Sequence, residues 1–302
     1  MSIDLQQVIN SPFAVRFLSL IAQGIPPRIG YPLCDIIGGR IATRRKSKLT
    51  QAVRLNQWVA RGANLGKAAL DKAVRKTLQN NARDIYNLYH YLGQPEAMKQ
   101  MIALNASARQ VIERPEFADR GLVILGLHLS NFDFVLRAIS QCGFKPMVLT
   151  IPDPQGGRRV EYEMRKQTGM NLVPASISAL RRAVKHLEQG GMVVTGMDRP
   201  IPKSKQQPNF FGKPASLPMH YIYLASKAQV PIIVMPVIQQ SDGKYHVLGS
   251  EPIEMEYDPD REKAILRNAE RVLKEAEYFI QQAPQQWNVP LPVWPELLGK
   301  IS

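Results

Sequence analysis

The residues best suited to chemistry lie where an apolar run ends, in the stretch GLVILGLHLSNFDF of residues 121–134. The apolar residues 122–127 have the length and β-branched content of a buried strand. His128 follows this run directly, and Ser130 and Asn131 are both good helix N-cap residues. The pattern therefore predicts a strand, a short turn and a helix, with His128 at the carboxyl edge of the strand.

A helix that begins at Phe132 would place Asp133 in its first turn. Because the chain reverses between them, the Asp133 carboxylate could turn back onto the His128 imidazole. A carboxylate on one ring nitrogen fixes the tautomer and leaves the other nitrogen as a base. The carboxyl edge is also where open α/β sheets bind ligands. The alternative is a core histidine beside a solvated aspartate, and the spacing alone leaves that alternative open.

The composition is that of a globular protein. The 302 residues suffice for one large domain or two, and 45% are hydrophobic while 21% are charged. The two cysteines, Cys34 and Cys142, have no disulfide-framework or metal-ligand spacing, which indicates a reducing compartment. We expect neither a metal site nor a bound cofactor.

The positive charge is concentrated in the first third of the chain. The net charge is +14, and residues 1–110 contain 16 Lys and Arg against 5 Asp and Glu, a net charge of +11. Residues 111–302 contribute only +3. This asymmetry indicates a polyanionic partner, either nucleic acid or an anionic membrane face. The basic residues are not interleaved with aromatic residues and form no known nucleic-acid module, so nucleic acid is not expected.

The N-terminal region also has an amphipathic character. We expect no secretory signal and no spanning helix, because the apolar runs are interrupted by charges and prolines. Two short amphipathic pieces, residues 13–23 and 28–41, precede a basic cluster at residues 44–48. Such helices can lie in the interface of an anionic membrane. They could equally cap the core, with the basic cluster solvated.

Short apolar runs and amphipathic stretches predict the fold class. Residues 1–110 are expected to be mostly helical, including helices over 67–92 and 96–112. Strands are expected over residues 122–127, 147–151, 192–197, 232–237 and 245–248. Helices are expected over residues 160–168, 176–188, 217–227 and 261–282, and the tail, 284–302, as an extended segment. This alternation is typical of an α/β protein with a mainly parallel central sheet flanked by helices.

Several further stretches accompany His128-Leu-Ser-Asn-Phe-Asp133. They are Tyr162-Glu-Met-Arg165, Thr195-Gly-Met-Asp198-Arg199, Asn209-Phe-Phe-Gly212-Lys-Pro-Ala and Pro231-Ile-Ile-Val-Met-Pro236. In this order, the chain resembles the lipid A biosynthesis and phosphatidylinositol mannoside acyltransferases of the lysophospholipid acyltransferase superfamily. The family signature is His, four residues, then Asp or Glu. The resemblance is strong over residues 115–250 and looser in the N-terminal third.

The resemblance implies a role for each matching residue. His128 would be the general base, and Asp133 would orient it. The polar groups near the reaction centre would be Asn131, Arg165, Asp198 and Arg199, and Phe210, Phe211 and Gly212 would shape a wall near the acyl chain or the acceptor. It also implies an α/β acyltransferase core over 111–302, continuous with a basic helical region, 1–110, that faces the membrane.

Two features differ from the lipid A enzymes. Those enzymes usually have Trp-Glu where this chain has Phe132-Asp133. They also have an N-terminal spanning helix, which we do not expect in this chain. The differences favour the peripheral, phosphatidylinositol mannoside-like branch. The expected location is the cytoplasmic face of the cell membrane.

The expected reaction is transfer of a fatty acyl chain from acyl-CoA or acyl carrier protein to a hydroxyl of a glycolipid or lysophospholipid. No GxSxG or cysteine nucleophile is recognisable, so direct attack is favoured over an acyl-enzyme. Phosphate groups could meet Arg158, Arg159, Lys203 and Lys205, although solvated loops explain these residues as well. A thioesterase and an inert lipid-binding protein of the same fold are the alternatives.

Overall fold

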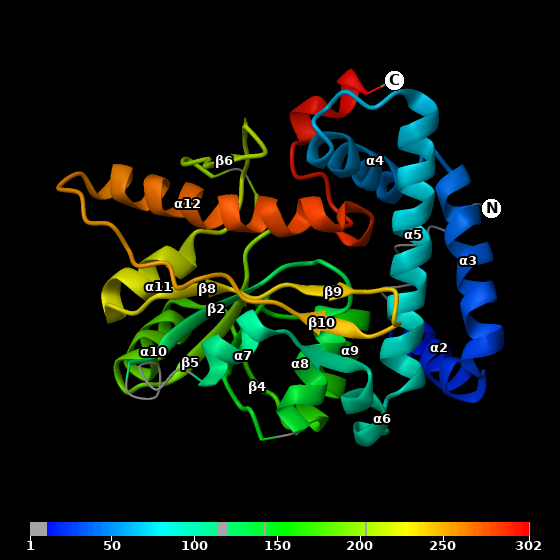
Figure 1. The fold of residues 1–302 in the computed structure, drawn as a ribbon, viewed down its shortest axis with the longest axis horizontal. Helices are drawn as coiled ribbons and strands as arrows, with labels where there is room; N and C mark the ends of the chain where they lie inside the picture. Colours follow the sequence, from blue (N-terminus) through cyan, green and yellow to red (C-terminus); the bar gives the residue numbers. More distant parts are fainter. Residues whose placement is uncertain (1–10, 114–119, 142, 203, 302) are drawn as a thin grey trace.

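The computed structural model describes residues 11–113, 120–141, 143–202 and 204–301, so Cys142 and Lys203 lie outside the described residues. A five-stranded, all-parallel sheet forms its centre (Figure 1). From one edge to the other its strands are β4 (Asn171–Pro174), β3 (Met147–Thr150), β5 (Met192–Gly196), β2 (Leu122–Gly126) and β8 (Ile232–Val234). The predicted mainly parallel sheet is confirmed, although β4 was not predicted as a strand.

Four helices that connect the parallel strands, and a fifth, α12, that follows the last strand, cover the sheet. They are α8 (Phe132–Gln141), α9 (Gly157–Gln167), α10 (Ile177–Glu188), α11 (His220–Ala228) and α12 (Arg261–Gln282). Strand β2 is buried on both faces, because Val123 and Leu125 belong to one apolar cluster and Leu122 and Ile124 to another. This two-sided burial explains the continuous apolar run in its sequence.

A second, three-stranded sheet departs from prediction. It contains β1 (Ile102–Leu104), β10 (Tyr245–Val247) and β9 (Val237–Gln239) in that order. The helix predicted over 96–112 is wrong, because α6 (Pro95–Gln100) and α7 (Ala106–Glu113) flank β1, which pairs with β10. The strand predicted over 232–237 is split between β8 and β9. Pro236, which has no N–H to donate, stands at the break.

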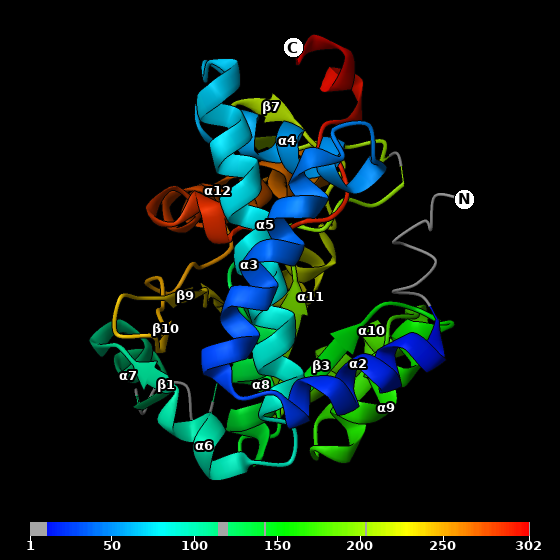
Figure 2. The ribbon, with the colours of Figure 1, turned by 90° about the vertical axis from the view of Figure 1, so that its right-hand side faces the viewer.

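Residues 11–90 of the structure contain the helices α2 (Pro12–Gly24), α3 (Pro27–Thr43), α4 (Lys48–Ala60) and α5 (Lys67–His90). The stretches predicted as helical over residues 13–23, 28–41 and 67–92 match α2, α3 and α5 within two residues at each end, whereas α4 was not predicted. Figure 2 shows α3 beside α5, and α2 beside α9. The α3–α5 contact requires glycine, because a Cβ at Gly38 would lie 2.6 Å from the Gln79 Cα.

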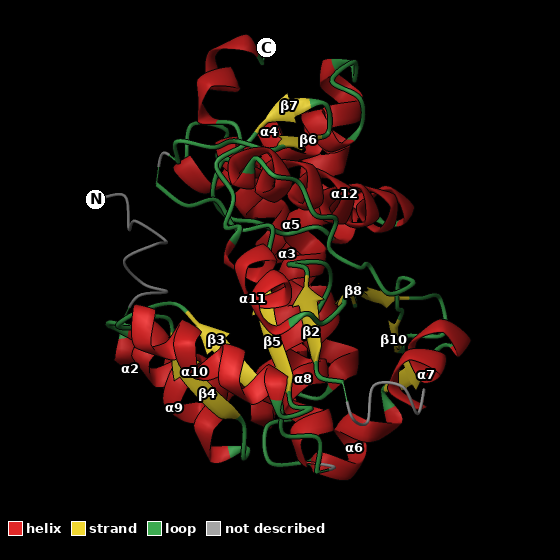
Figure 3. Cartoon of the chain, turned by 90° about the vertical axis from the view of Figure 1, so that its left-hand side faces the viewer, coloured by secondary structure: helices red, strands yellow, loops and turns green. Residues whose placement is uncertain are grey.

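The C-terminal segment returns to the core instead of extending away from it. It contains two 3-10 helices, η2 (Pro284–Gln286) and η3 (Pro295–Lys300), and its Trp287 and Trp294 are almost completely buried. The short hairpin β6 (Asn209–Phe210) and β7 (Lys213–Pro214) lies close to the C-terminal helical turns (Figure 3). The tail, predicted as an extended segment, is therefore extended only between and beside its two 3-10 helices, and it contributes residues to the core.

Candidate active site

His128 and Asp198 meet because their strands are in register. Strands β2 and β5 are parallel neighbours, and Gly126 pairs with Gly196. His128 and Asp198 each stand two residues beyond these glycines, so both side chains reach the same point at the carboxyl edge. The His128 Nδ1 lies 2.7 Å from Asp198 Oδ1, and the His128 backbone N–H donates to Asp198 Oδ2 at 2.9 Å.

The C-terminal segment supports this pair. The Trp287 indole Nε1–H donates to Asp198 Oδ2 at 2.8 Å, and the Asn288 backbone N–H donates to the His128 carbonyl at 2.8 Å. The Ser130 N–H donates to the Gln286 carbonyl at 2.8 Å, although Ser130 has a left-handed φ of 50°. Three consecutive residues of the tail therefore fix the turn that carries His128.

The electrostatics favour an ionised Asp198. Burial alone would raise the pKa of this fully buried carboxyl. The electrostatic interaction with His128, the hydrogen bonds from its ring and backbone, and the Trp287 indole outweigh burial and lower that pKa. An ionised Asp198 holds a proton on Nδ1 of His128. Nε2 of His128 is therefore left as a base, and it has no hydrogen-bond partner among the described residues.

Asp133 does not contact His128 as predicted. Its Oδ2 accepts a hydrogen bond from the Arg137 guanidinium at 2.9 Å, and its Oδ1 forms an ion pair with Arg165 at 2.8 Å. Burial would raise the pKa of Asp133, but these two arginines outweigh it and lower that pKa. The prediction was wrong because the first helical turn of α8 faces the arginines of α8 and α9. Asp133 holds Arg165, and Asp198 holds the histidine.

Asn131 uses its polar atoms within the protein. Its Nδ2–H donates to the Asp84 carbonyl at 2.8 Å and to the Tyr245 hydroxyl at 3.4 Å, and its Oδ1 accepts from the Phe134 N–H at 3.4 Å. It thus caps α8, as its residue type predicts, and joins α8 to α5 and β10. This placement makes Asn131 a residue that positions the site.

His128 is one of the residues that line a pocket of about 130 Å³. One wall comes from α5, where Asn81 and Asp84 lie, and the other from residues 130–133, with Asn288 beside them. Burial raises the pKa of Asp84 to about 7, and a hydrogen bond from the Tyr245 hydroxyl, 3.1 Å from its Oδ1, opposes this. Sequence reasoning missed Asp84, because nothing in a helical pattern shows which side chain will face the sheet edge.

Arginines gather beside the pair. Burial lowers the pKa of the Arg199 guanidinium, and the like charges of Arg158 and Arg165 lower it further. Arg165 is paired with Asp133, whereas Arg199 and Arg158 form no ion pair with the residues that the structure describes. Arg159 and Lys205 are exposed. Two of the predicted phosphate-binding cations, Arg158 and Arg159, thus lie on α9, and Arg158 is the one near Arg199.

The aromatic residues Phe210 and Phe211 lie behind the site. Phe210 is completely buried, and its ring packs against those of Trp287 and Trp294 at centroid distances of 5.9 and 5.6 Å. Gly212, like Phe211, has a left-handed φ, which forms the tight turn between β6 and β7. These residues support Trp287, the donor to Asp198.

Comparison with known proteins agrees with this arrangement. The family model described as bacterial lipid A biosynthesis acyltransferase matches residues 6–294 of the 302. The chain belongs to this family. No match was found among curated proteins. The family membership establishes an acyltransferase that acts on lipid substrates.

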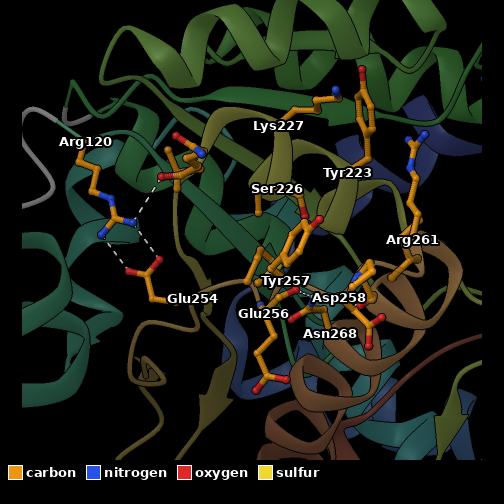
Figure 4. A pocket seen from close by; sticks show the side chains of 17 residues that line it. Arg120, Tyr223, Ser226, Lys227, Glu254, Glu256, Tyr257, Asp258, Arg261 and Asn268 are labelled. Atoms are coloured by element: carbon orange, nitrogen blue, oxygen red, sulfur yellow. Dashed lines mark hydrogen bonds and ion pairs between the residues drawn. The ribbon is translucent and has the colours of Figure 1, made fainter.

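Another pocket in this acyltransferase is distant from the pair. It measures about 540 Å³ and is lined by residues that precede β2 and β8, at the amino edge of the sheet, and by α11 and α12 (Figure 4). Its acidic residues are paired with arginines: Glu254 with Arg120, Glu256 with Arg271, and Asp258 with Arg267. None of the predicted site residues lines it.

The described part of the acyltransferase contains no helix that is long and apolar enough to cross a bilayer. Within the same residues, no group of three or more side chains is arranged to hold a metal ion.

Proposed function

We propose that this protein transfers a fatty acyl chain from a thioester donor, acyl-CoA or acyl carrier protein, to a hydroxyl of a glycolipid or lysophospholipid at a membrane surface. The observation that carries the proposal is the His128–Asp198 pair at the carboxyl edge of the sheet. It provides a base with a fixed tautomer, beside a pocket that can admit a hydroxyl.

In the proposed reaction, His128 Nε2 accepts the proton of the acceptor hydroxyl while the hydroxyl oxygen attacks the thioester carbonyl. The new C–O bond gives a tetrahedral intermediate, and the C–S bond then breaks. The departing thiolate receives the proton from the imidazolium, which Asp198 stabilises meanwhile. No acyl-enzyme forms, because acceptor and donor react directly.

The developing oxyanion needs hydrogen-bond donors. The backbone N–H groups of Phe132 and Asp133, in the first turn of α8, donate to no acceptor among the described residues. The amino end of a helix carries a partial positive charge, which stabilises an anion. We assign the oxyanion to this helix end, since the Arg165 guanidinium is already paired with Asp133.

Phosphate groups of the donor or of the acceptor fit the arginines. Arg199 and Arg158 repel each other and form no ion pair within the described residues, so an anion between them would relieve the repulsion. Arg199 directly follows Asp198, and hence the bound phosphate would lie next to the reacting groups.

The two N-terminal helices support membrane contact. Exposed apolar side chains form a stripe on each, with Phe13, Phe17 and Leu20 on α2 and with Ile29 and Ile36 on α3. Helix α2 packs against α9, which bears Arg158 (Figure 2). A basic cluster at residues 44–48 follows α3. Apolar stripes beside basic residues favour peripheral binding to an anionic, cytoplasmic membrane face.

Thiol release from palmitoyl-CoA and from palmitoyl acyl carrier protein tests the reaction, with and without a lipid extract as acceptor. Wild-type release should rise with lipid, and His128→Ala should abolish it. A matched control is His186→Ala, because His186 lies against Gly191 at the opposite edge of the sheet. Lipid-independent release would indicate a thioesterase, and no release with either donor would indicate an inert lipid-binding protein.

Vesicle co-sedimentation tests membrane contact. The double variant Phe17→Ser/Leu20→Ser should lose binding to anionic vesicles, and binding of the wild type should fall as salt rises. Ile177→Ser is a matched control, because Ile177 is an apolar residue, 74% exposed, on α10 and not on the two N-terminal helices. Binding to neutral vesicles as strong as to anionic vesicles would contradict the electrostatic part of the proposal.

A further inference from the structure

The pocket beside His128 contains polar groups that the protein leaves unpaired. Asp84 Oδ2, the Asn81 amide and the Ser130 hydroxyl form no hydrogen bond with any described residue. The Oδ1 of Asn288 is buried without a partner. A buried acceptor without a donor costs free energy, so a ligand that brings donors to this pocket is favoured.

The unpaired carboxylate is firmly held. Asp84 Oδ1 accepts from the Tyr245 hydroxyl, which in turn accepts a hydrogen bond from the Asn87 amide at 2.7 Å. Tyr245 is completely buried, and its ring packs against Phe134 at 5.1 Å. Asp84 is therefore an oriented acceptor on the α5 wall of the pocket.

The chemistry of the pocket selects hydroxyl groups. Two unpaired acceptors, a hydroxyl and an amide can pair with adjacent hydroxyls, which donate and accept in turn. An ammonium group donates hydrogen bonds but cannot accept them, so it would leave the Asn81 N–H groups unpaired, whereas a hydroxyl can do both. The pocket volume of about 130 Å³ admits only a few heavy atoms, which suits a polyol fragment.

We infer that Asp84 is a specificity-determining residue, which binds a second hydroxyl of a polyol head group while His128 deprotonates the neighbouring one. This inference rests on the proposed function, because it names the acceptor class of that same site. The inference extends the proposed function, because it predicts that a lipid with a single, isolated hydroxyl is a poor acceptor.

Binding of two short-chain lipids, which differ in one hydroxyl, tests the inference. Dihexanoyl phosphatidylglycerol carries a vicinal diol, and dihexanoyl phosphatidyl-1,3-propanediol carries one hydroxyl at the same net charge. Calorimetry at pH 8, above the pKa of about 7 of Asp84, should show that the wild type binds the diol at least about tenfold more tightly, as expected for one hydrogen bond to a charged acceptor. Asp84→Asn should remove most of this preference, and Asn81→Ala should reduce it less.

The control is Asp71→Asn, the same change on the same helix about 20 Å away by the helical rise. It should keep the diol preference. Equal binding of the two lipids by the wild type, an unchanged preference in Asp84→Asn, or tighter binding of the phosphatidylethanolamine analogue would overturn the inference.

Transfer assays on the same lipids report the proposed function separately. A diol preference without transfer from either thioester would support the Asp84 site and count against the transferase. Transfer to both lipids at equal efficiency would support the transferase and count against Asp84.

Discussion

Each of the two walls of the pocket beside His128 contains an aspartate, and the two carboxylates differ in ion pairing and in the direction of their pKa shift. On α8, Asp133 is neutralised by Arg137 and Arg165, and its pKa is lowered. On α5, Asp84 has no cationic partner among the described residues, and burial raises its pKa to about 7. The Asp133 carboxylate on the α8 wall is paired and therefore structural, whereas Asp84 on the α5 wall keeps an unpaired carboxylate oxygen for a ligand.

Asp198 is paired like Asp133, but its partner is the proposed base, His128. We expect Asp198→Asn to lower the rate of acyl transfer about 10³–10⁴-fold, since an amide can hold the wrong tautomer of His128. Single-turnover kinetics with a saturating thioester would measure this loss. If Asp133→Asn lowers the rate more than Asp198→Asn does, the assignment of Asp198 to the histidine is wrong.

The ion pairs of Asp133 on the α8 wall should contribute strongly to the free energy of unfolding. Asp133→Asn leaves the fully buried Arg137 without its counter-ion, and we expect it to lower the free energy of unfolding by about 3–5 kcal/mol. Urea unfolding at neutral pH would measure the change. Adding Arg137→Met should restore much of the loss, because it removes the orphaned charge.

The matched control is Asp258→Asn, which breaks the more exposed ion pair with Arg267 and should cost at most about 1 kcal/mol. Equal losses of unfolding free energy for Asp133→Asn and Asp258→Asn would show that the buried ion pair is worth no more than the exposed one.

Much of this architecture follows from local sequence. The apolar runs that became β2 and β5, and the capping residue Asn131 that starts α8, were predictable because burial and capping act over a few residues. The meeting of His128 with Asp198 was also accessible. Both residues directly follow the apolar runs predicted as strands, and neighbouring parallel strands end at the same edge.

Long-range contacts were not accessible in the same way. The donor Trp287 is 89 residues away from Asp198 in the chain, and Tyr245 is 161 residues away from Asp84. Strand β1 exists because β10 pairs with it, and its own sequence is compatible with a helix. These features depend on how distant segments pack, and helical or strand periodicity contains no information about that.

The tail contributes one side-chain hydrogen bond to the His128–Asp198 pair. We expect Trp287→Phe to lower the transfer rate about tenfold, because Asp198 keeps His128 but loses the indole donor. Since the aromatic packing with Phe210 is retained, the free energy of unfolding should change much less than in Asp133→Asn. A rate equal to that of the wild type would show that the tail acts only through its backbone hydrogen bonds.

The raised pKa of Asp84 on the α5 wall predicts how stability should change with pH. The pKa of Asp84 rises from an ordinary value of 3.8 to about 7 on folding, so the folded state binds its proton more tightly. This contribution is fully present below about pH 4 and is lost as the pH rises toward 7, with a slope of at most about 1.4 kcal/mol per pH unit. Asp84→Asn should remove this slope, so the variant should gain stability relative to the wild type between pH 4 and 7.

Tyr245→Phe removes the hydrogen bond that lowers the pKa of Asp84, and it should move the loss of stability to higher pH. Parallel unfolding free energies of Asp84→Asn and wild type over this range would mean that the α5 carboxylate is ionised throughout, like that of Asp133, and the contrast between the two walls would disappear.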